Sequence, residues 1–285
     1  MIAFMKRNLL VFFRDRSAVF FSLLASFIII GLYVLFLGDV WTSSLKDLGN
    51  AREIMDHWVM AGLLAITSVT TTMGAFNTMV NDKTQKITKD FYSSPISRRS
   101  LAGGYILSAF IIGFVMSVVT LVFAEIYIVA EGGALMSFHT LIKVLLLILL
   151  ADLTNTSMIF LLTSFFSSES AFSTASAVIG TLIGFLTGIY LPIGQLPDAV
   201  QTVIKLFPPS HAAVLLRQTM MEDAMHTGFA EVPTAYANEF KEFLGVTLQF
   251  SGHQISALTS IGYLLAAAAI CFILAILNLS RKKRA

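Results

Sequence analysis

Residues able to carry out catalysis are few in this sequence and form no catalytic pattern. The histidines are His57, His139, His211, His226 and His253; none forms His-Glu-x-x-His, and none lies at metal-ligand spacing from the single cysteine, Cys271. The sequence has no Gly-x-Ser-x-Gly elbow and no Gly-x-x-x-x-Gly-Lys-Ser/Thr phosphate-binding loop. We therefore expect no catalytic site, no metal site, no cofactor bound by the chain and no ATP hydrolysis by the chain itself.

Polar side chains that stand within long uncharged runs are the better candidates for function. Asp152, with Asn155 beside it, interrupts one such run, and a charge near a bilayer centre faces the protein interior or a wet cavity. Asp152 either lines a substrate path or joins two helices as a protonated or hydrogen-bonded group. Glu125 is another candidate pathway residue, although pairing with Lys143 is the simpler expectation. Thr71 either lines a cavity or bonds its own helix backbone.

The uncharged runs define the elements that must position these residues. With hydrophobic residues at 56% and charged residues at 13%, the chain has too much apolar surface for a water-facing globule. Each run reaches the roughly 20 residues that an α-helix needs to cross a bilayer. We predict an all-α membrane protein with one domain, 1–285, and six transmembrane helices at about 18–38, 58–80, 101–127, 142–166, 171–192 and 256–279.

The basic residues predict the orientation of these helices. One side has Lys6, Arg7, Arg14, Arg16, Lys83, Lys86, Lys89, Arg98, Arg99, Arg281, Lys282, Lys283 and Arg284, and the other has Lys46, Arg52, Lys143, Lys205, Arg217 and Lys241. Because basic residues concentrate in cytoplasmic loops, both termini are expected in the cytoplasm. The net charge of +2 gives no reason to expect a nucleic-acid partner.

The first residues, 1–16, predict a helix that lies in the membrane interface before the first span. Bulky apolar groups alternate with basic groups on a helical period. On this reading Phe4, Leu9, Phe12 and Phe13 face lipid, while Lys6, Arg7, Arg14 and Arg16 face headgroups. An ordinary positively charged flank is the alternative.

The segment 193–253, between the fifth and sixth spans, predicts an outer re-entrant helical hairpin. Prolines at Pro192, Pro197, Pro208 and Pro209 punctuate two short apolar runs, which we expect to form helices at 198–207 and 210–222. Neither run is long enough to span a membrane. A further amphipathic stretch, Tyr236–Phe250, is expected on the outer surface.

Three glycines in the fifth run predict close helix packing. Gly180, Gly184 and Gly188 recur at four-residue spacing, which places them on one face of a helix and lets another backbone approach. The same motif serves contacts within one chain and contacts between chains, and we favour the contact between chains.

Two stretches of sequence carry a resemblance to a known family. SSPISRRSLAGGYIL leads into the third span, and GIYLPIGQLPDAVQTVIKLFPPSHAAVLLRQTM ends the fifth span at the proline-marked hairpin. Together with the six spans and the N-terminal helix, they resemble the membrane subunit of ABC-2 type exporters over nearly the whole chain.

The resemblance implies partners and a docking site. Such permeases pair with a second permease chain, identical or paralogous, and bind two copies of an ABC ATPase subunit, which holds Mg-ATP. The inner loop between spans two and three resembles the family's cytoplasmic coupling helix. In this chain the docking residues would be Asp82, Lys83, Lys86, Lys89, Asp90 and Phe91, and the location would be a prokaryotic plasma membrane.

The cargo is left open by the sequence. Apolar, aromatic and weakly charged spans favour a hydrophobic or amphipathic cargo such as a drug, a lipid-like toxin or a small antimicrobial peptide. The first alternative is export of a lipid-linked polysaccharide. The second, from another class, is a membrane immunity or assembly protein that transports nothing.

Overall fold

A computed structural model describes residues 1–38, 50–93, 96–250 and 253–281. The expected basic residues Lys46, Lys282, Lys283 and Arg284 lie outside the described residues, as do Pro95 of the SSPISRR stretch and residues 251–252 of the outer segment.

Within the described residues, six helices are long and apolar enough to cross a membrane. These are α2 with the turn that follows it (Arg16–Leu35), α4 (Ala51–Thr84), α6 (Arg98–Ala130), α7 (Phe138–Phe165), α8 (Glu169–Leu186) and α13 (Ala257–Arg281, apolar through Leu279). The prediction of an all-α membrane protein with six such helices is confirmed. Helices α4 and α6 extend several residues beyond the expected spans at both ends, while α8 ends earlier than expected.

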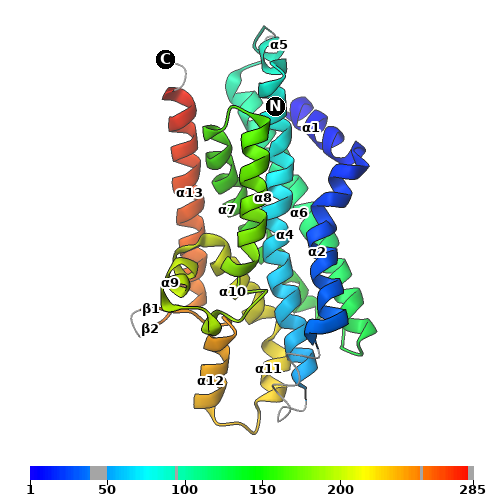
Figure 1. The fold of residues 1–285 in the computed structure, drawn as a ribbon, viewed down its shortest axis with the longest axis vertical. Coiled ribbons are helices and arrows are strands. Elements are labelled where there is room, and N and C mark those ends of the chain that lie inside the picture. Colours follow the sequence, from blue (N-terminus) through cyan, green and yellow to red (C-terminus); the bar gives the residue numbers. More distant parts are fainter. Residues whose placement is uncertain (39–49, 94–95, 251–252, 282–285) are drawn as a thin grey trace.

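Helix α4 is the centre of the bundle, with most of its residues buried. It packs against α2, α6, α7 and α8, and α13 packs along α7 (Figure 1). The N-terminus and the last turn of α13 lie at the end of the molecule that carries the short helix α5 (Ile87–Ser93). We call this the α5 end, and the opposite end the α12 end after the helix α12 (Thr234–Phe243).

The N-terminal segment forms the helix α1 (Ile2–Arg14), which crosses obliquely to α2 (Arg16–Leu32) (Figure 1). Asp15 separates the two helices and caps α2 by accepting a hydrogen bond from the Ala18 amide at 3.0 Å. The expectation that Phe4 and Phe12 face lipid is wrong. Both are buried because α1 packs on α6 and α4. Helix α2 continues into a π-helical turn, Tyr33–Leu37.

The segment after α8 forms four short helices and a small hairpin at the α12 end. They are α9 (Asp198–Leu206), α10 (Pro208–Met220), α11 (Glu222–Gly228), α12 and the strands β1 (Gln249–Phe250) and β2 (His253–Gln254), preceded by the 3-10 turn η2 (Ile193–Gln195). The amphipathic stretch Tyr236–Phe250 is divided between α12 and β1, because Gly245 ends α12 with a left-handed φ of 67°.

The prolines of this segment occupy the positions that favour helix starts. Pro197 is the N-cap of α9, and Pro208 and Pro209 are the first two residues of α10. Pro192 precedes η2. Helix α10 enters the bundle and packs against α4, α7 and α13, so this pair of short helices has one member inside the protein and one, α9, at its edge.

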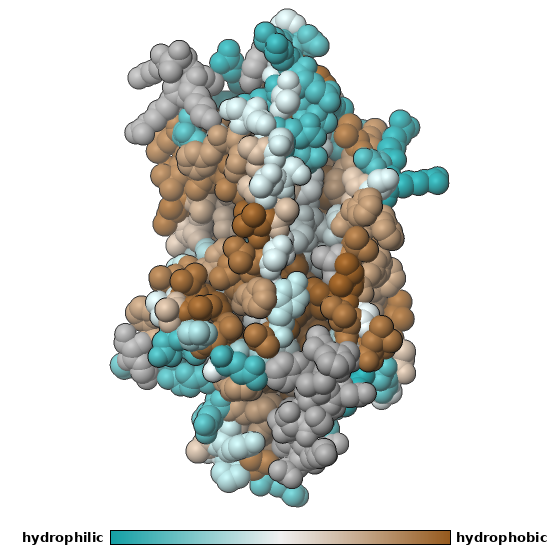
Figure 2. Space-filling model, in the orientation of Figure 1, coloured by the Kyte–Doolittle hydropathy of each residue, from teal (hydrophilic) through white to brown (hydrophobic). Residues whose placement is uncertain are grey.

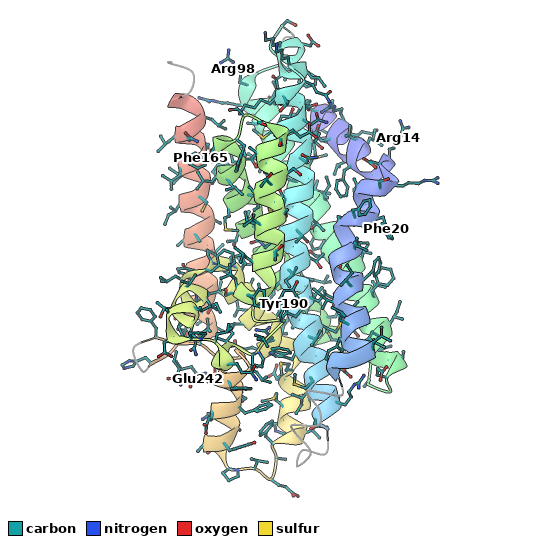
Figure 3. All side chains as sticks on the ribbon, viewed as in Figure 1. Arg14, Phe20, Arg98, Phe165, Tyr190 and Glu242 are labelled. Carbon is teal, nitrogen blue, oxygen red and sulfur yellow. The ribbon has the colours of Figure 1, made fainter. Side chains whose placement is uncertain are left out.

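The face of the molecule drawn in Figure 2 has an apolar middle region between two polar ends. Figure 2 shows hydrophobic residues over the middle of the visible face and hydrophilic residues towards both ends. Among the labelled side chains, Phe20 projects from the middle region, whereas Arg14 and Arg98 lie towards the α5 end and Glu242 lies towards the α12 end (Figure 3). This distribution is that of a protein set across a bilayer.

The glycine motif of the fifth span is not one helix face. Helix α8 ends at Leu186, and Gly188 follows with a φ of 69°. The Gly188 amide donates to the Phe185 carbonyl at 3.1 Å and the Ile189 amide to the Gly184 carbonyl at 3.0 Å, which is the Schellman ending of a helix. The expectation is therefore wrong for Gly188.

The other two glycines also differ from each other. Gly184 is covered by the ring of Tyr190 from the same chain, whereas nothing lies within 4 Å of the position of a Cβ on Gly180. Only Gly180 of the three keeps open space for another chain.

We predict that Gly188→Ala lowers the melting temperature of the purified chain in detergent, whereas Gly180→Ala does not. A left-handed alanine costs about 1–2 kcal/mol, and its Cβ would lie 2.7 Å from Ile193 Cγ1. Alanine at Gly180 meets no neighbour and favours the helix. Equal melting temperatures for the two variants would contradict this account of the end of α8.

Candidate functional site

The α5 end presents a short helix on a sharp reversal of the chain. Helix α4 stops at Thr84, and Lys86 adopts a left-handed φ of 62° before α5 begins at Ile87. Lys86, Lys89 and Asp90 are exposed. Helix α5 thus extends beyond the bundle at this end (Figure 1), with Lys89 and Asp90 on its accessible surface and Lys86 in the turn before it.

The other expected docking residues hold α5 and α1 to the bundle. The Phe91 ring meets the Phe4 ring edge-on with centroids 5.0 Å apart, and Phe4 meets Tyr105 at 4.9 Å. Asp82 is 3% exposed. It accepts hydrogen bonds from Arg7 Nη1 at 2.5 Å, Arg7 Nη2 at 2.8 Å and the Tyr105 hydroxyl at 2.6 Å. We call Arg7, Asp82 and Tyr105, with Phe4 and Phe91, the inner knot.

The inner knot corrects the sequence interpretation of Asp82, Lys83 and Phe91. Asp82 is bonded within the chain, and Lys83 Nζ donates to the Phe166 carbonyl at 2.7 Å, at the end of α7. The hydrogen bond to Asp82 raises the pKa of Arg7 above its ordinary value, so the guanidinium stays protonated. Asp82 and Lys83 thus connect the last turn of α4 to α1, α6 and α7, while Phe91 packs α5 against α1. Lys89 and Asp90 of α5, and Lys86 just before it, remain exposed.

A polar cluster lies inside the bundle, half-way along three helices. Ser68 of α4 donates a hydrogen bond to Asp152 Oδ1 of α7, and Asn155 Nδ2 donates to Ser68 Oγ at 2.8 Å. Asp152 is 0% exposed and Asn155 1%. Ser117 of α6 approaches the same carboxyl group without forming a hydrogen bond. The prediction that Asp152 faces the bundle interior agrees with this position.

Two other polar candidates have ordinary structural roles. Thr71 donates to the Thr67 carbonyl at 2.7 Å, one turn back in its own helix. Glu125 accepts a hydrogen bond from the Met136 amide at 3.1 Å, while Lys143 Nζ lies 3.6 Å from Glu222 Oε2. The expected Glu125–Lys143 pair is therefore wrong, because the 131–137 connection folds back over Glu125 and α11 brings Glu222 to Lys143.

Arg217, expected only as one of the basic residues on the side opposite the termini, is fully buried in α10. Its Nη2 donates to the Gly188 carbonyl at 3.0 Å, its Nη1 to the Gly245 carbonyl at 3.4 Å, and its guanidinium lies 4.8 Å from the Trp58 ring centroid. Trp58 Nε1 donates to the Leu244 carbonyl at 2.7 Å. Arg217 thus joins the ends of α8 and α12 to α4. An arginine within the apolar run AAVLLRQTM was the signal for it.

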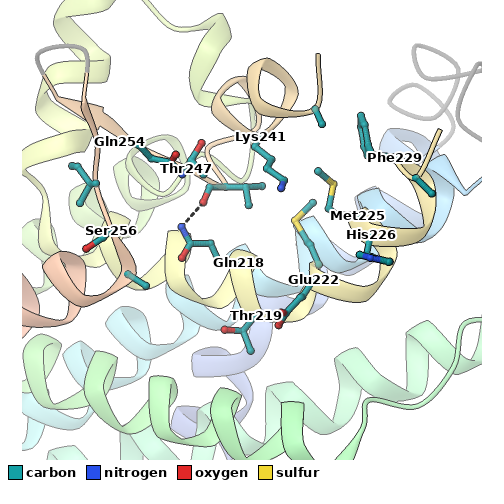
Figure 4. A pocket seen from close by; sticks show the side chains of 16 residues that line it. Gln218, Thr219, Glu222, Met225, His226, Phe229, Lys241, Thr247, Gln254 and Ser256 are labelled. Atoms are coloured by element: carbon teal, nitrogen blue, oxygen red, sulfur yellow. Dashed lines mark hydrogen bonds between the residues drawn. The ribbon is translucent and has the colours of Figure 1, made fainter. Parts of the chain in front are cut away.

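A cavity of about 850 Å³ opens at the α12 end. Its polar lining is Gln218, Thr219, Glu222, His226, Lys241, Thr247, Gln254 and Ser256, and its apolar lining includes Met221, Met225, Phe229, Val246 and Ile255. Lys241 of α12 and Gln218 of α10 face each other across it (Figure 4), and Gln218 Nε2 donates to the Val246 carbonyl at 2.9 Å. The mixture of thioether, aromatic and polar groups suits an amphipathic ligand.

No group of three or more histidine, cysteine, aspartate or glutamate side chains suited to a metal ion occurs among the residues that the structure describes.

Comparison with known families identifies the class of the protein. Residues 42–277 match the family described as ABC-2 family transporter protein. The chain belongs to this family. A comparison with curated proteins gave no match.

The family gives the general role. The chain is a multi-pass membrane permease component of an ABC transporter, and membership implies a partner ATP-binding subunit. This role agrees with the six membrane-spanning helices.

Proposed function

We propose that this permease exports a hydrophobic or amphipathic molecule from the cytoplasm, powered by ATP that a separate subunit hydrolyses. The observation that carries the proposal is α5, a short helix extending from the bundle with Lys86, Lys89 and Asp90 exposed. It follows the buried central helix α4 directly, so a partner bound to α5 can move the core. The α5 end, which also carries the N-terminus and the last turn of α13, is then the cytoplasmic side.

The proposed assembly has two permease chains, identical or paralogous, and two ATP-binding subunits with Mg-ATP, in a prokaryotic plasma membrane. Closure of the ATP-binding subunits moves α5, and the inner knot passes the motion to α1 and α6, because Phe91 packs on Phe4 of α1 and Asp82 is hydrogen-bonded to Arg7 of α1 and Tyr105 of α6. Rigid-body movement of one permease chain against the other then opens the path. The open surface at Gly180 is the proposed contact with the second chain.

The cargo class follows from the surfaces available to it. The helices are apolar, and the cavity at the α12 end combines Met225 and Phe229 with polar groups, which favours a drug, a lipid-like toxin or a small antimicrobial peptide. A lipid-linked polysaccharide is the second candidate, and a non-transporting immunity or assembly protein is the third. The accessible surface of α5 favours a transporter over the third.

Transport in reconstituted vesicles tests the proposal. The chain, co-expressed with the ATP-binding subunit from its own host, is placed in proteoliposomes with a fluorescent amphipathic dye. We expect ATP to drive the dye to the side of the membrane opposite the ATP-binding subunit. Movement of a lipid-linked sugar but not of the dye would select the polysaccharide candidate. ATP hydrolysis with no movement of either would contradict the proposed export.

A further inference from the structure

The polar cluster around Asp152 contains more buried polar oxygens than its hydrogen bonds satisfy. In the described part of the chain, buried polar atoms without a hydrogen-bond partner include Asp152 Oδ2, Asn155 Oδ1, Thr72 Oγ1, Ser117 Oγ and Thr156 Oγ1. All five are oxygens. Buried polar groups in native proteins are almost always hydrogen-bonded or bound to water or an ion. We therefore expect these oxygens to bind a ligand, such as a water molecule or an ion.

The five atoms come from three helices that pack on one another. Thr72 stands one turn from Ser68 on α4, Asn155 and Thr156 stand one turn from Asp152 on α7, and Ser117 lies on α6. Residues one turn apart share a helix face, and α4, α6 and α7 are mutually packed. The oxygens therefore face a common interior region.

Gly113 of α6 shows how closely this region is assembled. A Cβ built on Gly113 would lie 2.8 Å from Thr72 Oγ1 and 3.2 Å from Asp152 Oδ1. The bare Cα of this glycine thus lets both the Thr72 hydroxyl of α4 and the carboxyl group of Asp152 on α7 lie close to α6.

The charge of the cluster decides what kind of ligand fits. Asp152 is 0% exposed, and no ion pair involves it in the described residues. A lone carboxylate in a bilayer must be neutralised. Neighbouring hydroxyl groups can donate hydrogen bonds to the carboxylate but leave its charge in place. A proton neutralises the charge without joining the other oxygens, whereas a metal cation neutralises it and takes several oxygens together. Because there is one carboxylate, a monovalent ion leaves no net charge, and a divalent ion leaves one uncompensated.

We propose that Asp152, Asn155, Thr72 and Ser117, with Thr156, form a binding site for a monovalent metal cation, Na⁺, in the middle of the membrane domain. Carboxylate, amide and hydroxyl oxygens are the ligands of hard cations. The ion joins α4, α6 and α7 where the bundle has no other charge to compensate Asp152. This site is independent of the direction of transport and of the cargo.

The test is thermal unfolding of the purified chain in detergent at constant ionic strength, with NaCl, KCl or choline chloride. Binding to the folded state raises its stability, and we expect saturating Na⁺ to raise the melting temperature by at least about 3 °C over choline. Asp152→Asn keeps the shape and removes the charge, so it abolishes the rise. Radioactive ²²Na⁺ binding follows the same pattern.

Two neighbouring threonines provide a matched pair of variants. Thr72→Val removes a proposed ligand and weakens the Na⁺ response severalfold, while Thr71→Val removes a hydroxyl bonded only to its own helix and leaves the response unchanged. This pair keeps the test decisive if Asp152→Asn fails to fold. Equal melting temperatures in the three salts, or stability that follows pH and not Na⁺, would overturn the proposal in favour of a protonated aspartate or bound water.

Discussion

Arg7→Met will destabilise the chain strongly, and Asp82→Asn added to it will restore most of the lost stability. Arg7 is the only charged group bonded to the Asp82 carboxylate in the described part of the chain. Removing it leaves a negative charge on a side chain that is 4% exposed. Breaking a buried pair from one side costs about 3–5 kcal/mol. We expect about 3 kcal/mol, because the Arg7 side chain is 34% exposed.

The single change Asp82→Asn should cost much less. It leaves a partly exposed guanidinium that can turn towards water, and the amide still accepts from the Tyr105 hydroxyl. Thermal melting of the four proteins in a double-mutant cycle measures the coupling. Arg14→Met, on an exposed residue of the same helix, is the control and should change stability by less than about 0.5 kcal/mol. Additive losses in the cycle would contradict the inner knot.

Lys86→Glu with Lys89→Glu will reduce ATP hydrolysis by the assembled transporter at least tenfold while the chain still inserts and folds. Both side chains are exposed on or beside α5, so the changes leave the bundle intact. Like charges placed opposite each other across an interface cost several kcal/mol of binding free energy. Because about 1.4 kcal/mol lowers an affinity tenfold, this cost is large enough for the expected loss of hydrolysis. Hydrolysis by the co-purified complex in lipid, with and without cargo, is the measurement.

The control for this pair makes the same charge change elsewhere at the same end. Lys6→Glu with Arg14→Glu alters two exposed basic residues of α1 and should leave hydrolysis within about twofold of the unmodified complex, because neither lies on α5. Equal loss in both double variants would show that total charge at this end matters, and that α5 is not the docking element.

The membrane-spanning helices could be predicted from the sequence alone because the pattern that defines each of them is local. Twenty apolar residues in a row predict a span whatever that helix packs against. Charges on short loops predict an orientation, which stays a prediction. The start of α9 after Pro197 was also local, since proline fixes φ, whereas α10 begins at Pro208, two residues before the expected start at 210. Exact ends were less predictable: Gly188 stands in an apolar run, and only its left-handed φ shows that α8 has stopped before it.

Side-chain partners distant in sequence were not predictable in the same way. Asp82 looked like an exposed docking residue in a charged loop, yet it meets Arg7, 75 residues away. Asp152 was expected inside the bundle, but its contacts with Ser68 and with the bare Cα of Gly113 depend on how three helices rotate. The position of Arg217 in an apolar run was visible in the sequence, but its role was not predictable. Its partners, the carbonyl groups of Gly188 and Gly245, come close to it only in the folded α12 end.

The docking of an ATP-binding subunit on α5 is tested most directly by site-specific cross-linking. Because Cys271 is the single cysteine, the Cys271→Ser variant has no thiol that could react with the cross-linker. A photoactivatable cross-linker is then attached at Lys89→Cys on α5, or at Glu239→Cys on the exposed surface of α12. We predict a covalent adduct with the co-purified ATP-binding subunit from position 89 and none from position 239. An adduct from position 239, or none from position 89 while the subunit still co-purifies, would contradict the account.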